Sequence, residues 1–477
     1  MNYQLIGGEM ADFTDREPVG GELAAYLIGL LRPLGGRILL AGPHAPALIG
    51  ALTGFAEVTC LVRSQPDAAA LADCGATVLC GSLAKLTGAE RYDAVVALDG
   101  VERLCSVEGP QYDWAESVRA LHRVLRPGGA LLLAVENELG VHRLVDRATV
   151  TFAHTTDAWR PEGEFGAKPG SPARLEARLA AEGLTVGWLG AAWPLPAAPT
   201  FAATPAALRD GPSGALSAAA AASVAAAFAG TPVLSDPRRL TAAAIRAGVG
   251  AEFAPGWLAL AFRGTELGVL VPPVLSGGGP AADLPAGRVL EELLIGACLR
   301  HDLPAIRRLL AGWVASEPTA GFDNVLVDGD TYTVLDPARA TGEPGGVLRR
   351  FAHTLLAGGY AQPWPAAADV PSLTTILLAA AGLAGTVPDA DDAPPAPHSL
   401  REHEEQVRRL EEQLADAAAR VAYVETELIY RDAELRRARL QIDAFAGKVG
   451  YRITKLGARA ARRAVRAVRR TSPLFKD

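Results

Sequence analysis

The chain has 477 residues, of which 49% are hydrophobic and 21% are charged, and its net charge at pH 7 is −7. This length exceeds what one hydrophobic core supports, and the composition excludes a wholly disordered chain, so several folded parts are expected. The cysteines at positions 60, 74, 80, 105 and 298 have neither the paired spacing of a zinc site nor a disulfide framework, so no metal site is expected.

The N-terminal residues, MNYQLIGGEM, lack the charged segment and apolar run of a signal peptide. The most hydrophobic windows also fall short of the length that crosses a bilayer. We therefore expect a cytoplasmic location, peripheral at the inner membrane surface if the basic C-terminal segment binds lipid.

Short β-rich runs alternate with helical stretches between residues 36 and 135. The predicted strands cover residues 37–41, 58–62, 77–80, 94–98 and 130–135. This alternation is typical of a parallel sheet with crossover helices, so the sequence predicts a Rossmann-like α/β fold. The helix before the last strand has Trp114, Val118 and Leu121 on one face. It is expected to end at residues 126–129, Arg-Pro-Gly-Gly, because proline and glycine interrupt helices.

Residues 184–189 and 257–262 are predicted to form a closing strand pair, separated by an alanine-rich helical insertion. We expect the first domain to end at residue 264 and a smaller α+β domain of unknown role to cover residues 265–386. In that domain, residues 324–327 and 331–335 flank the turn Asp328-Gly329-Asp330, which predicts a hairpin. The Asp- and Pro-rich segment 387–397 is predicted to be a linker.

Residues 398–445 follow a strict seven-residue repeat, which predicts a coiled coil. One core position is aliphatic throughout and consists of Leu400, Val407, Leu414, Val421, Leu428, Leu435 and Ile442. The other is weaker and consists of His403, Leu410, Ala417, Val424, Arg431, Ala438 and Phe445. We expect self-association or pairing with a partner helix. A long helix that folds back on its own globular part is the alternative.

Residues 446–477 contain ten Lys or Arg and one acidic residue, Asp477. Arginines recur at short helical intervals among apolar residues such as Ile453, Leu456 and Val465, which is typical of a basic amphipathic helix. An anionic membrane surface is one expected partner, and a solvated, frayed tail is the alternative. Nucleic acid is disfavoured, because aromatic residues for base stacking are nearly absent and the main body is acidic.

Two segments carry a resemblance to a known family. Residues 92–104 read YDAVVALDGVERL, and residues 125–140 read LRPGGALLLAVENELG. They resemble class I S-adenosylmethionine-dependent methyltransferases, most closely a subgroup found with bacterial glycosyltransferases in which the fifth strand runs into Glu-Asn-Arg-Leu-Gly. Residues 194–196 and 251–261 continue the resemblance, which covers about the first 264 residues and implies the methyltransferase fold with S-adenosylmethionine as cofactor.

In such a sheet the ligand lies at the carboxyl ends of the strands, where the strand order reverses. The resemblance places residues 40–47, 62–64, 81–82 and 98–103 around the cofactor, with Gly42, His44, Asp99 and Glu102 as candidate cofactor-binding residues. Several positions depart from the family. Leu40 stands where it has an acidic residue, His44 and Pro46 where it has glycines, Val62 where a carboxylate binds the ribose, and Ser82 where an Asp is common.

Alternatives remain open for two of these candidates. Asp99 could replace a lost carboxylate, but a charge at a helix start is the favoured interpretation. His44 could act as a general base, but a loop residue is favoured, since the sequence shows no partner for it.

The resemblance implies methyl transfer from S-adenosylmethionine to a hydroxyl of a sugar or secondary metabolite, as part of glycan assembly. Glu136 and Asn137, at the end of the fifth strand, are the candidate substrate-binding residues. No catalytic residue is assigned, because this transfer depends mainly on alignment of donor and acceptor. The alternative is a non-catalytic pseudo-methyltransferase scaffold that recruits partners through the coiled coil and the basic tail.

The predicted hairpin of the second domain also looks like the magnesium-binding hairpin of small-molecule kinases, with Asn324 and Asp336 in the metal-binding positions. The His-Gly-Asp that should precede it is absent, since residues 315–321 read ASEPTAG. A structural hairpin is therefore expected.

Overall fold

The fold comes from a computed structural model. It describes residues 3–15, 18–86, 91–106, 109–147, 168–264, 268, 270–281, 284–384, 398–447 and 449–471. The chain divides into two compact units, Met1–Glu404 and Glu405–Asp477, and each is described by itself.

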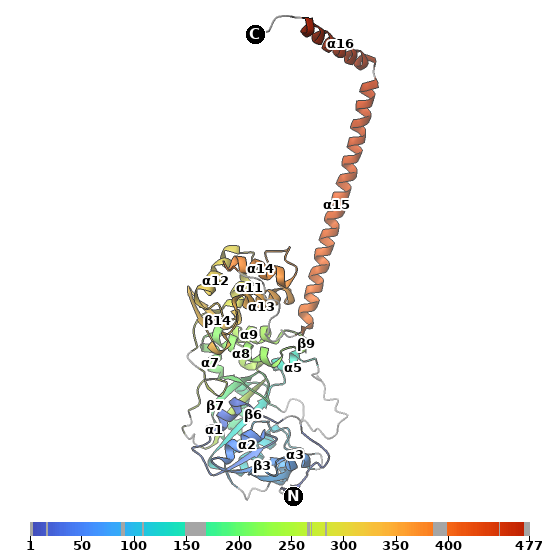
Figure 1. The fold of residues 1–477 in the computed structure, drawn as a ribbon. Coiled ribbons are helices and arrows are strands. Elements are labelled where there is room, and N and C mark those ends of the chain that lie inside the picture. The colour runs from blue at the N-terminus through green and yellow to red at the C-terminus, as the bar shows by residue number, and fades with distance from the viewer. Residues whose placement is uncertain are drawn as a thin grey trace. The chain divides into compact units, whose positions relative to one another are not determined.

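The first unit is built on an 11-stranded sheet (Figure 1). Its strands are β1 (Gln4–Gly7), β2 (Arg37–Ala41), β3 (Glu57–Val62), β4 (Thr77–Gly81), β5 (Tyr92–Ala97), β6 (Leu125–Glu136), β7 (Leu184–Trp193), β8 (Phe201–Ala203), β10 (Gly256–Arg263), β11 (Val274–Ser276) and β12 (Gly279–Pro280). Their spatial order is β1-β4-β3-β2-β5-β6-β10-β7-β8-β11-β12. The predicted strands and the Rossmann-like α/β fold are confirmed.

Strands β1 to β6 are parallel to one another, whereas β10 is antiparallel to both β6 and β7. The order reverses between β2 and β5, which places the switch point there. The resemblance to class I methyltransferases places the ligand at this same reversal, between the first and fourth predicted strands. The predicted closing pair is confirmed as β7 and β10.

Helices cover both faces of the sheet. They are α1 (Glu22–Gly29), α2 (Pro46–Thr53), α3 (Gln65–Ala70), α4 (Trp114–Val124), α5 (Val141–Val145), α6 (Pro172–Ala181), α7 (Pro205–Asp210), α8 (Ser213–Ala227), α9 (Pro237–Arg246) and α10 (Gly250–Phe253). Successive side chains of β2 point to opposite faces. Ile38 therefore packs in one buried cluster with residues of α1 and α2, while Leu39 packs in the other with residues of α4.

The junction between α4 and β6 differs in detail from the prediction. The helix ends at Val124, and the strand is already paired at Leu125, which lies opposite Tyr92. The next pair joins Ala94 to Ala130, so residues 126–129 bulge out of the ladder. Proline and glycine are accommodated because a bulge leaves backbone groups outside the regular pairing.

The predicted domain boundary at residue 264 is too early. Strand β11 pairs with β8 and with β12, so residues 274–280 extend the main sheet. These strands are very short and have no strong apolar pattern. The smaller α+β part begins after them, at Arg288.

The smaller part contains a three-stranded sheet with its own buried core. Its elements are β13 (Arg288–Val289), α11 (Leu290–Leu299), α12 (Leu303–Ser316), β14 (Val325–Asp328), β15 (Thr331–Val334), α13 (Pro344–Ala357) and α14 (Val370–Ala380), with short 3-10 turns at Phe322–Asn324 and Pro337–Arg339. Trp313 and Phe351 both pack against the ring of Phe322 in that core. The predicted hairpin is confirmed, and Gly329 in its turn has a φ of 59°.

A 48-residue helix, α15 (Leu400–Gly447), covers the predicted coiled coil, and α16 (Val449–Thr471) covers most of the basic tail. Just before α15, β16 (His398–Ser399) pairs with β9 (Pro232–Val233). The predicted linker, residues 387–397, lies outside the described residues. Within the described part of the chain, no helix is both long and apolar enough to span a bilayer.

Candidate functional site

The turn after β2 lies at the switch point between β2 and β5. Its most buried polar residue is His44, which is 2% exposed. The ring Nδ1 lies 2.9 Å from the Gly42 carbonyl oxygen, and the Leu98 N–H donates to Nε2 over 3.3 Å. Because Nε2 accepts, Nδ1 carries the proton and donates to Gly42. The imidazole thus crosses the crevice in which such sheets hold their ligands.

The protonation of His44 suits this bridging position. Burial lowers its pKa to about 4; the hydrogen bond to Gly42 opposes that shift, and the positive charge of Arg103 adds to it. The ring is therefore neutral near pH 7. A general base works best with a pKa near the operating pH, so His44 serves as a buried structural link and not as a base.

The backbone of the same turn is already engaged. The Gly42 N–H donates to the Leu61 carbonyl over 2.9 Å, and the Ala45 N–H donates to the Val19 carbonyl over 2.8 Å. Pro43 and Pro46 have no N–H to offer. In the methyltransferases that this chain resembles, a glycine-rich turn presents backbone N–H groups to the cofactor. Here the N–H groups of Gly42 and Ala45 are bonded to carbonyls of the protein itself.

Asp99 faces the turn from the end of β5. Gly42 has a φ of 94°, which is strained for other residues, and a Cβ there would lie 3.3 Å from the Asp99 Cβ, so glycine suits this close approach. The Asp99 carboxylate forms a two-point ion pair with Arg103, and the two side chains are 4% and 8% exposed. Interpreting Asp99 as a helix-start charge was wrong, because residues 98–104 form turns and the next helix begins at Trp114.

The end of β3 carries a second buried ion pair, between Arg63 and Asp15. Their side chains are 3% and 2% exposed, and the guanidinium donates to both carboxylate oxygens over 2.8 and 3.2 Å. Arg63 also donates to the Cys105 carbonyl over 2.9 Å. One side chain therefore connects β3 to the N-terminal segment and to the loop after β5.

That N-terminal segment, residues 10–15 and 18–20, is named the strap. Met10 exchanges backbone hydrogen bonds with Arg63 and Gln65, over 2.8 and 3.0 Å. Val19 does the same with Pro43 and Ala45, over 3.2 and 2.8 Å. The strap therefore crosses the carboxyl ends of β3 and β2, directly over the predicted cofactor region.

The residues at the donor site do not fit S-adenosylmethionine in this arrangement. Val62, at the ribose position, is 1% exposed and offers no hydrogen-bonding group. Two N–H groups of the turn are already bonded, and the ring of His44 spans the crevice. A ribose hydroxyl buried without a partner costs about 1–3 kcal/mol, so such a pocket binds the ligand poorly.

Glu102 and Glu136 belong to a separate charged cluster with His142, Arg143 and Lys168. Glu136, the last residue of β6, lies 3.2 Å from His142 Nε2 and 3.4 Å from Arg143 Nη1. Lys168 Nζ lies 3.2 Å from a carboxylate oxygen of Glu102. The cluster thus joins the loop after β5 to the end of β6.

Electrostatics favour the ionised forms of Glu136 and Lys168. Burial alone would raise the pKa of Glu136, but the hydrogen bond from His142 and the positive charges of Lys168, His142 and Arg143 lower it to about 2. Burial opposes the charge of Lys168, yet the carboxylates of Glu102 and Glu136 raise its pKa. At neutral pH Glu136 is negative and Lys168 is positive, and these opposite charges suit binding of a polar group.

Asn137 is predicted to bind substrate, but in the structure its side chain bonds to the protein backbone. It is 2% exposed, and its amide nitrogen donates to the carbonyls of Glu252 and Ala254 over 2.6 and 2.8 Å. Its oxygen accepts the Leu139 N–H over 3.0 Å. The side chain therefore holds the segment before β10 against the end of β6.

Sequence reasoning missed Asp15, Arg63, Arg103 and Lys168. Only Arg103 had a usable signal, because it lies four residues after Asp99. Asp15 and Arg63 are 48 residues apart, and no local pattern links them.

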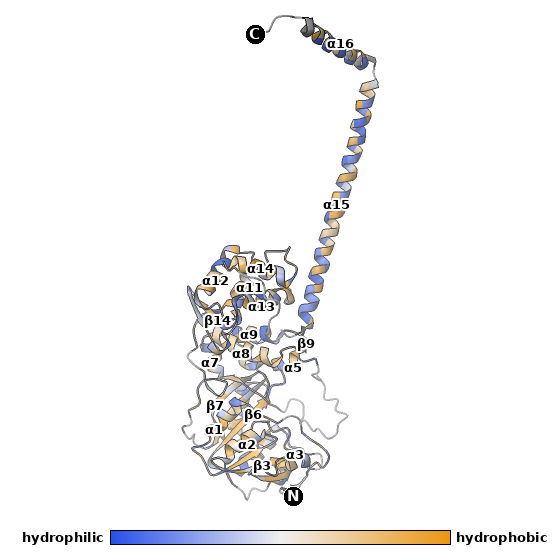
Figure 2. Cartoon of the chain, viewed as in Figure 1, coloured by the Kyte–Doolittle hydropathy of each residue, from blue (hydrophilic) through white to orange (hydrophobic). Residues whose placement is uncertain are grey.

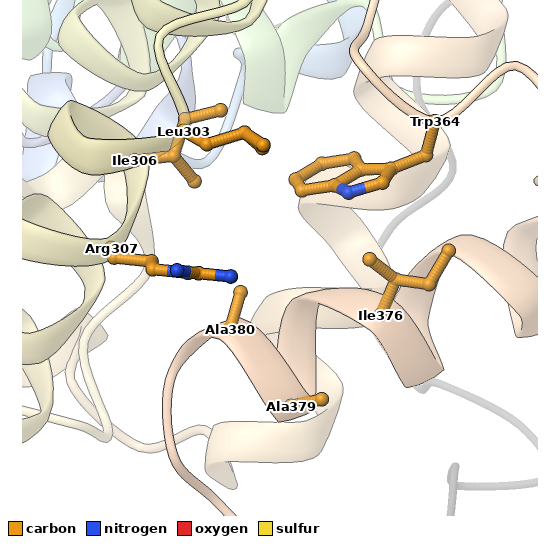
Figure 3. A pocket seen from close by; sticks show the side chains of 7 residues that line it. All are labelled: Leu303, Ile306, Arg307, Trp364, Ile376, Ala379 and Ala380. Carbon is orange, nitrogen blue, oxygen red and sulfur yellow. The ribbon is translucent and has the colours of Figure 1, made fainter.

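In the smaller part, the side-chain amide of Asn324 donates to the Asp336 carbonyl over 2.8 Å. The Asp336 N–H donates to the side-chain oxygen of Asn324 over 3.0 Å. This stabilises the hairpin, as the structural interpretation expected. A separate cavity of about 210 Å3 lies between α12 and α14, lined by Leu303, Ile306, Arg307, Trp364, Ile376, Ala379 and Ala380 (Figure 3). It contains none of the predicted site residues and is smaller than typical ligand pockets.

No family model matches the sequence, and no curated protein matches it. Solved structures with similar folds include the N-methyltransferase NodS from Bradyrhizobium japonicum with bound S-adenosylhomocysteine (18% identity, 23% of this chain, 59% of that chain, TM-score 0.19). Another is the 1,6-didemethyltoxoflavin N1-methyltransferase from Burkholderia thailandensis, also with S-adenosylhomocysteine (15% identity, 51% and 80% coverage, TM-score 0.28). A third is the CcbJ methyltransferase from Streptomyces caelestis (18% identity, 40% and 91% coverage, TM-score 0.25).

The fold follows from the observed topology, in which the parallel strands β4, β3, β2, β5 and β6 are followed by β10, which runs antiparallel to them, and then by β7, which is antiparallel to β10. By its strand order, the main sheet of the first unit is Rossmann-like, with the switch point where the resemblance to class I methyltransferases places it.

Proposed function

We propose that the first unit is a methyltransferase-fold protein whose donor site is closed by its own residues, and that it acts as a non-catalytic binding platform. The observation that carries this proposal is the neutral, buried His44 that bonds Gly42 on one side of the crevice and Leu98 on the other. The strap and the Arg63–Asp15 pair support it, because they cover the same edge of the sheet.

Opening this site would be costly. A donor could enter only after the strap released its hydrogen bonds to the turns and the buried ion pair separated. Each intramolecular hydrogen bond contributes about 1 kcal/mol, and separating a buried ion pair costs more. A ligand that binds only a rare open state has its apparent affinity reduced by the fraction of that state.

Isothermal titration with S-adenosylmethionine and S-adenosylhomocysteine tests this proposal. We expect no heat of binding up to millimolar ligand, while a functional methyltransferase in the same buffer serves as positive control. Micromolar binding by the unmodified chain would refute the closed site. The double variant His44→Gly with Val62→Asp restores a family-like turn and ribose partner, so any gain of binding would assign the closure to these two side chains.

Methyl transfer to a sugar or secondary-metabolite hydroxyl is the second candidate function. The charged cluster supports it, because Glu136 and Lys168 could hold a polar acceptor beside the switch point. A carboxylate with a pKa of about 2 is a weak base, so Glu136 would bind the acceptor and not remove its proton. Transfer of a labelled methyl group that is lost in Glu136→Gln would favour this candidate over the platform.

The platform proposal includes self-association through α15. Leu400, Val407, Leu414, Val421, Leu428, Leu435 and Ile442 lie on one face of this helix and are 41–72% exposed. Exposure of such a continuous aliphatic seam to water is unfavourable. In coiled coils a seam of this kind packs against a second helix. We propose that the second helix is α15 of another copy, because the seam continues through every repeat.

A further inference from the structure

The charged residues of helix α16 are all positive. Between Val449 and Thr471 its sequence contains no Asp or Glu. This differs from α15, where acidic and basic residues alternate and Arg431 pairs with Glu427 and Glu434 on its own helix. The positive charge of α16 is therefore not balanced within the helix, and it suits an anionic partner.

The charges of α16 are also segregated. At about 100° per residue, the six cations between Arg452 and Arg466 fall within an arc of about 100°. They are Arg452, Lys455, Arg459, Arg462, Arg463 and Arg466. The adjacent arc holds Ile453, Leu456, Ala460 and Ala464, and the first two are 62% and 65% exposed. Figure 2 shows hydrophilic and hydrophobic residues side by side along this helix.

We propose that α16 is an interfacial helix that binds anionic phospholipid surfaces. A basic arc beside an apolar arc lets the helix lie in the interface, with the cations at the lipid phosphates and the aliphatic side chains at the acyl boundary. The helix does not qualify as a membrane span. Nucleic acid fits less well, because the described face offers aliphatic side chains and no aromatic platform for stacking.

The proposal does not depend on the state of the donor site. If α15 pairs in parallel with a second copy, two α16 helices lie at the same end of one coiled coil and can bind one membrane together. The second helix then binds at a high effective concentration, which strengthens attachment without new contacts.

Flotation of the full chain with vesicles tests the proposal. We expect binding to phosphatidylcholine vesicles that contain 30% phosphatidylglycerol, little binding to pure phosphatidylcholine, and a loss of at least tenfold in the partition coefficient in 0.5 M NaCl. The double variant Arg462→Glu with Arg466→Glu should lower partitioning by a similar factor. Its control, Arg436→Glu with Arg437→Glu, makes the same charge change on α15 and should bind as the unmodified chain does.

A second pair of variants separates the apolar arc from charge. Ile453→Gln with Leu456→Gln should weaken flotation severalfold, whereas Ile429→Gln with Leu440→Gln, on exposed parts of α15, should not. Circular dichroism establishes that each variant keeps its helix content. Equal flotation on neutral vesicles, equal loss in test and control pairs, or binding to a single-stranded oligonucleotide in place of vesicles would overturn the proposal.

Discussion

Asp15 and Arg63 form a buried two-point ion pair that joins the strap to the end of β3. Breaking a buried pair leaves an uncompensated charge, so Asp15→Asn should lower the free energy of unfolding by about 3 kcal/mol. Urea denaturation measures this. The double variant Asp15→Leu with Arg63→Met removes both charges and should lose less than Asp15→Asn does. A loss below 1 kcal/mol in Asp15→Asn would contradict the buried pair.

His44 predicts a specific pH dependence of stability. Its pKa is lowered from 6.5 to about 4 in the folded chain, so the unfolded chain takes up a proton first as the pH falls. The neutral ring therefore contributes full stability above about pH 6.5. That contribution is lost between about pH 6.5 and pH 4, by about 3 kcal/mol at most.

The control for this prediction is His44→Gln, whose amide can donate to Gly42 and accept from Leu98 without titrating. Comparing the unfolding free energies of the two proteins from pH 7 to pH 4.5 isolates the histidine. The difference between them should shrink or reverse as the pH falls. Parallel curves would show that His44 is not buried in its neutral form.

The seam of α15 predicts a change in molecular mass. Leu414→Asp with Leu428→Asp places charges in the proposed coiled-coil core and should convert the associated form into monomers. The matched control, Ala419→Asp with Ala433→Asp, adds the same charges on the opposite side of the helix and should keep the larger mass. Sedimentation equilibrium distinguishes the two. A monomeric unmodified chain would rule out the seam as an interface between copies.

The sheet could be predicted because its signals are local. Each strand from β2 to β6 is a compact apolar run, and the segments at residues 92–104 and 125–140 carry the family resemblance that implies the strand order. The strap could not be predicted. Its effect depends on contacts between residues far apart in the chain, such as Val19 with Ala45 and Asp15 with Arg63, and a single carboxylate gives no sign of its partner.

The candidate site shows the same division. The positions of Gly42, His44 and Asp99 at the switch point follow from the strand order, so they were predictable. The interactions of these side chains were not predictable, because His44 bridges two strand ends and Asp99 pairs with Arg103 only in the folded chain. The sequence therefore predicted where these residues lie, whereas their hydrogen bonds and ion pairs depend on tertiary packing.

Asn137 gives the last prediction, on stability. All its hydrogen bonds go to backbone groups, at Glu252, Ala254 and Leu139. Asn137→Ala would leave the carbonyls of Glu252 and Ala254 and the Leu139 N–H without this partner and should cost about 2 kcal/mol of unfolding free energy. Asn137→Asp keeps the size but replaces the donor with a charged acceptor facing two carbonyls, so it should cost more at neutral pH than Asn137→Ala does. Thermal unfolding at pH 7 ranks the two, and an Asp variant as stable as the unmodified chain would show that Asn137 does not hold the segment before β10.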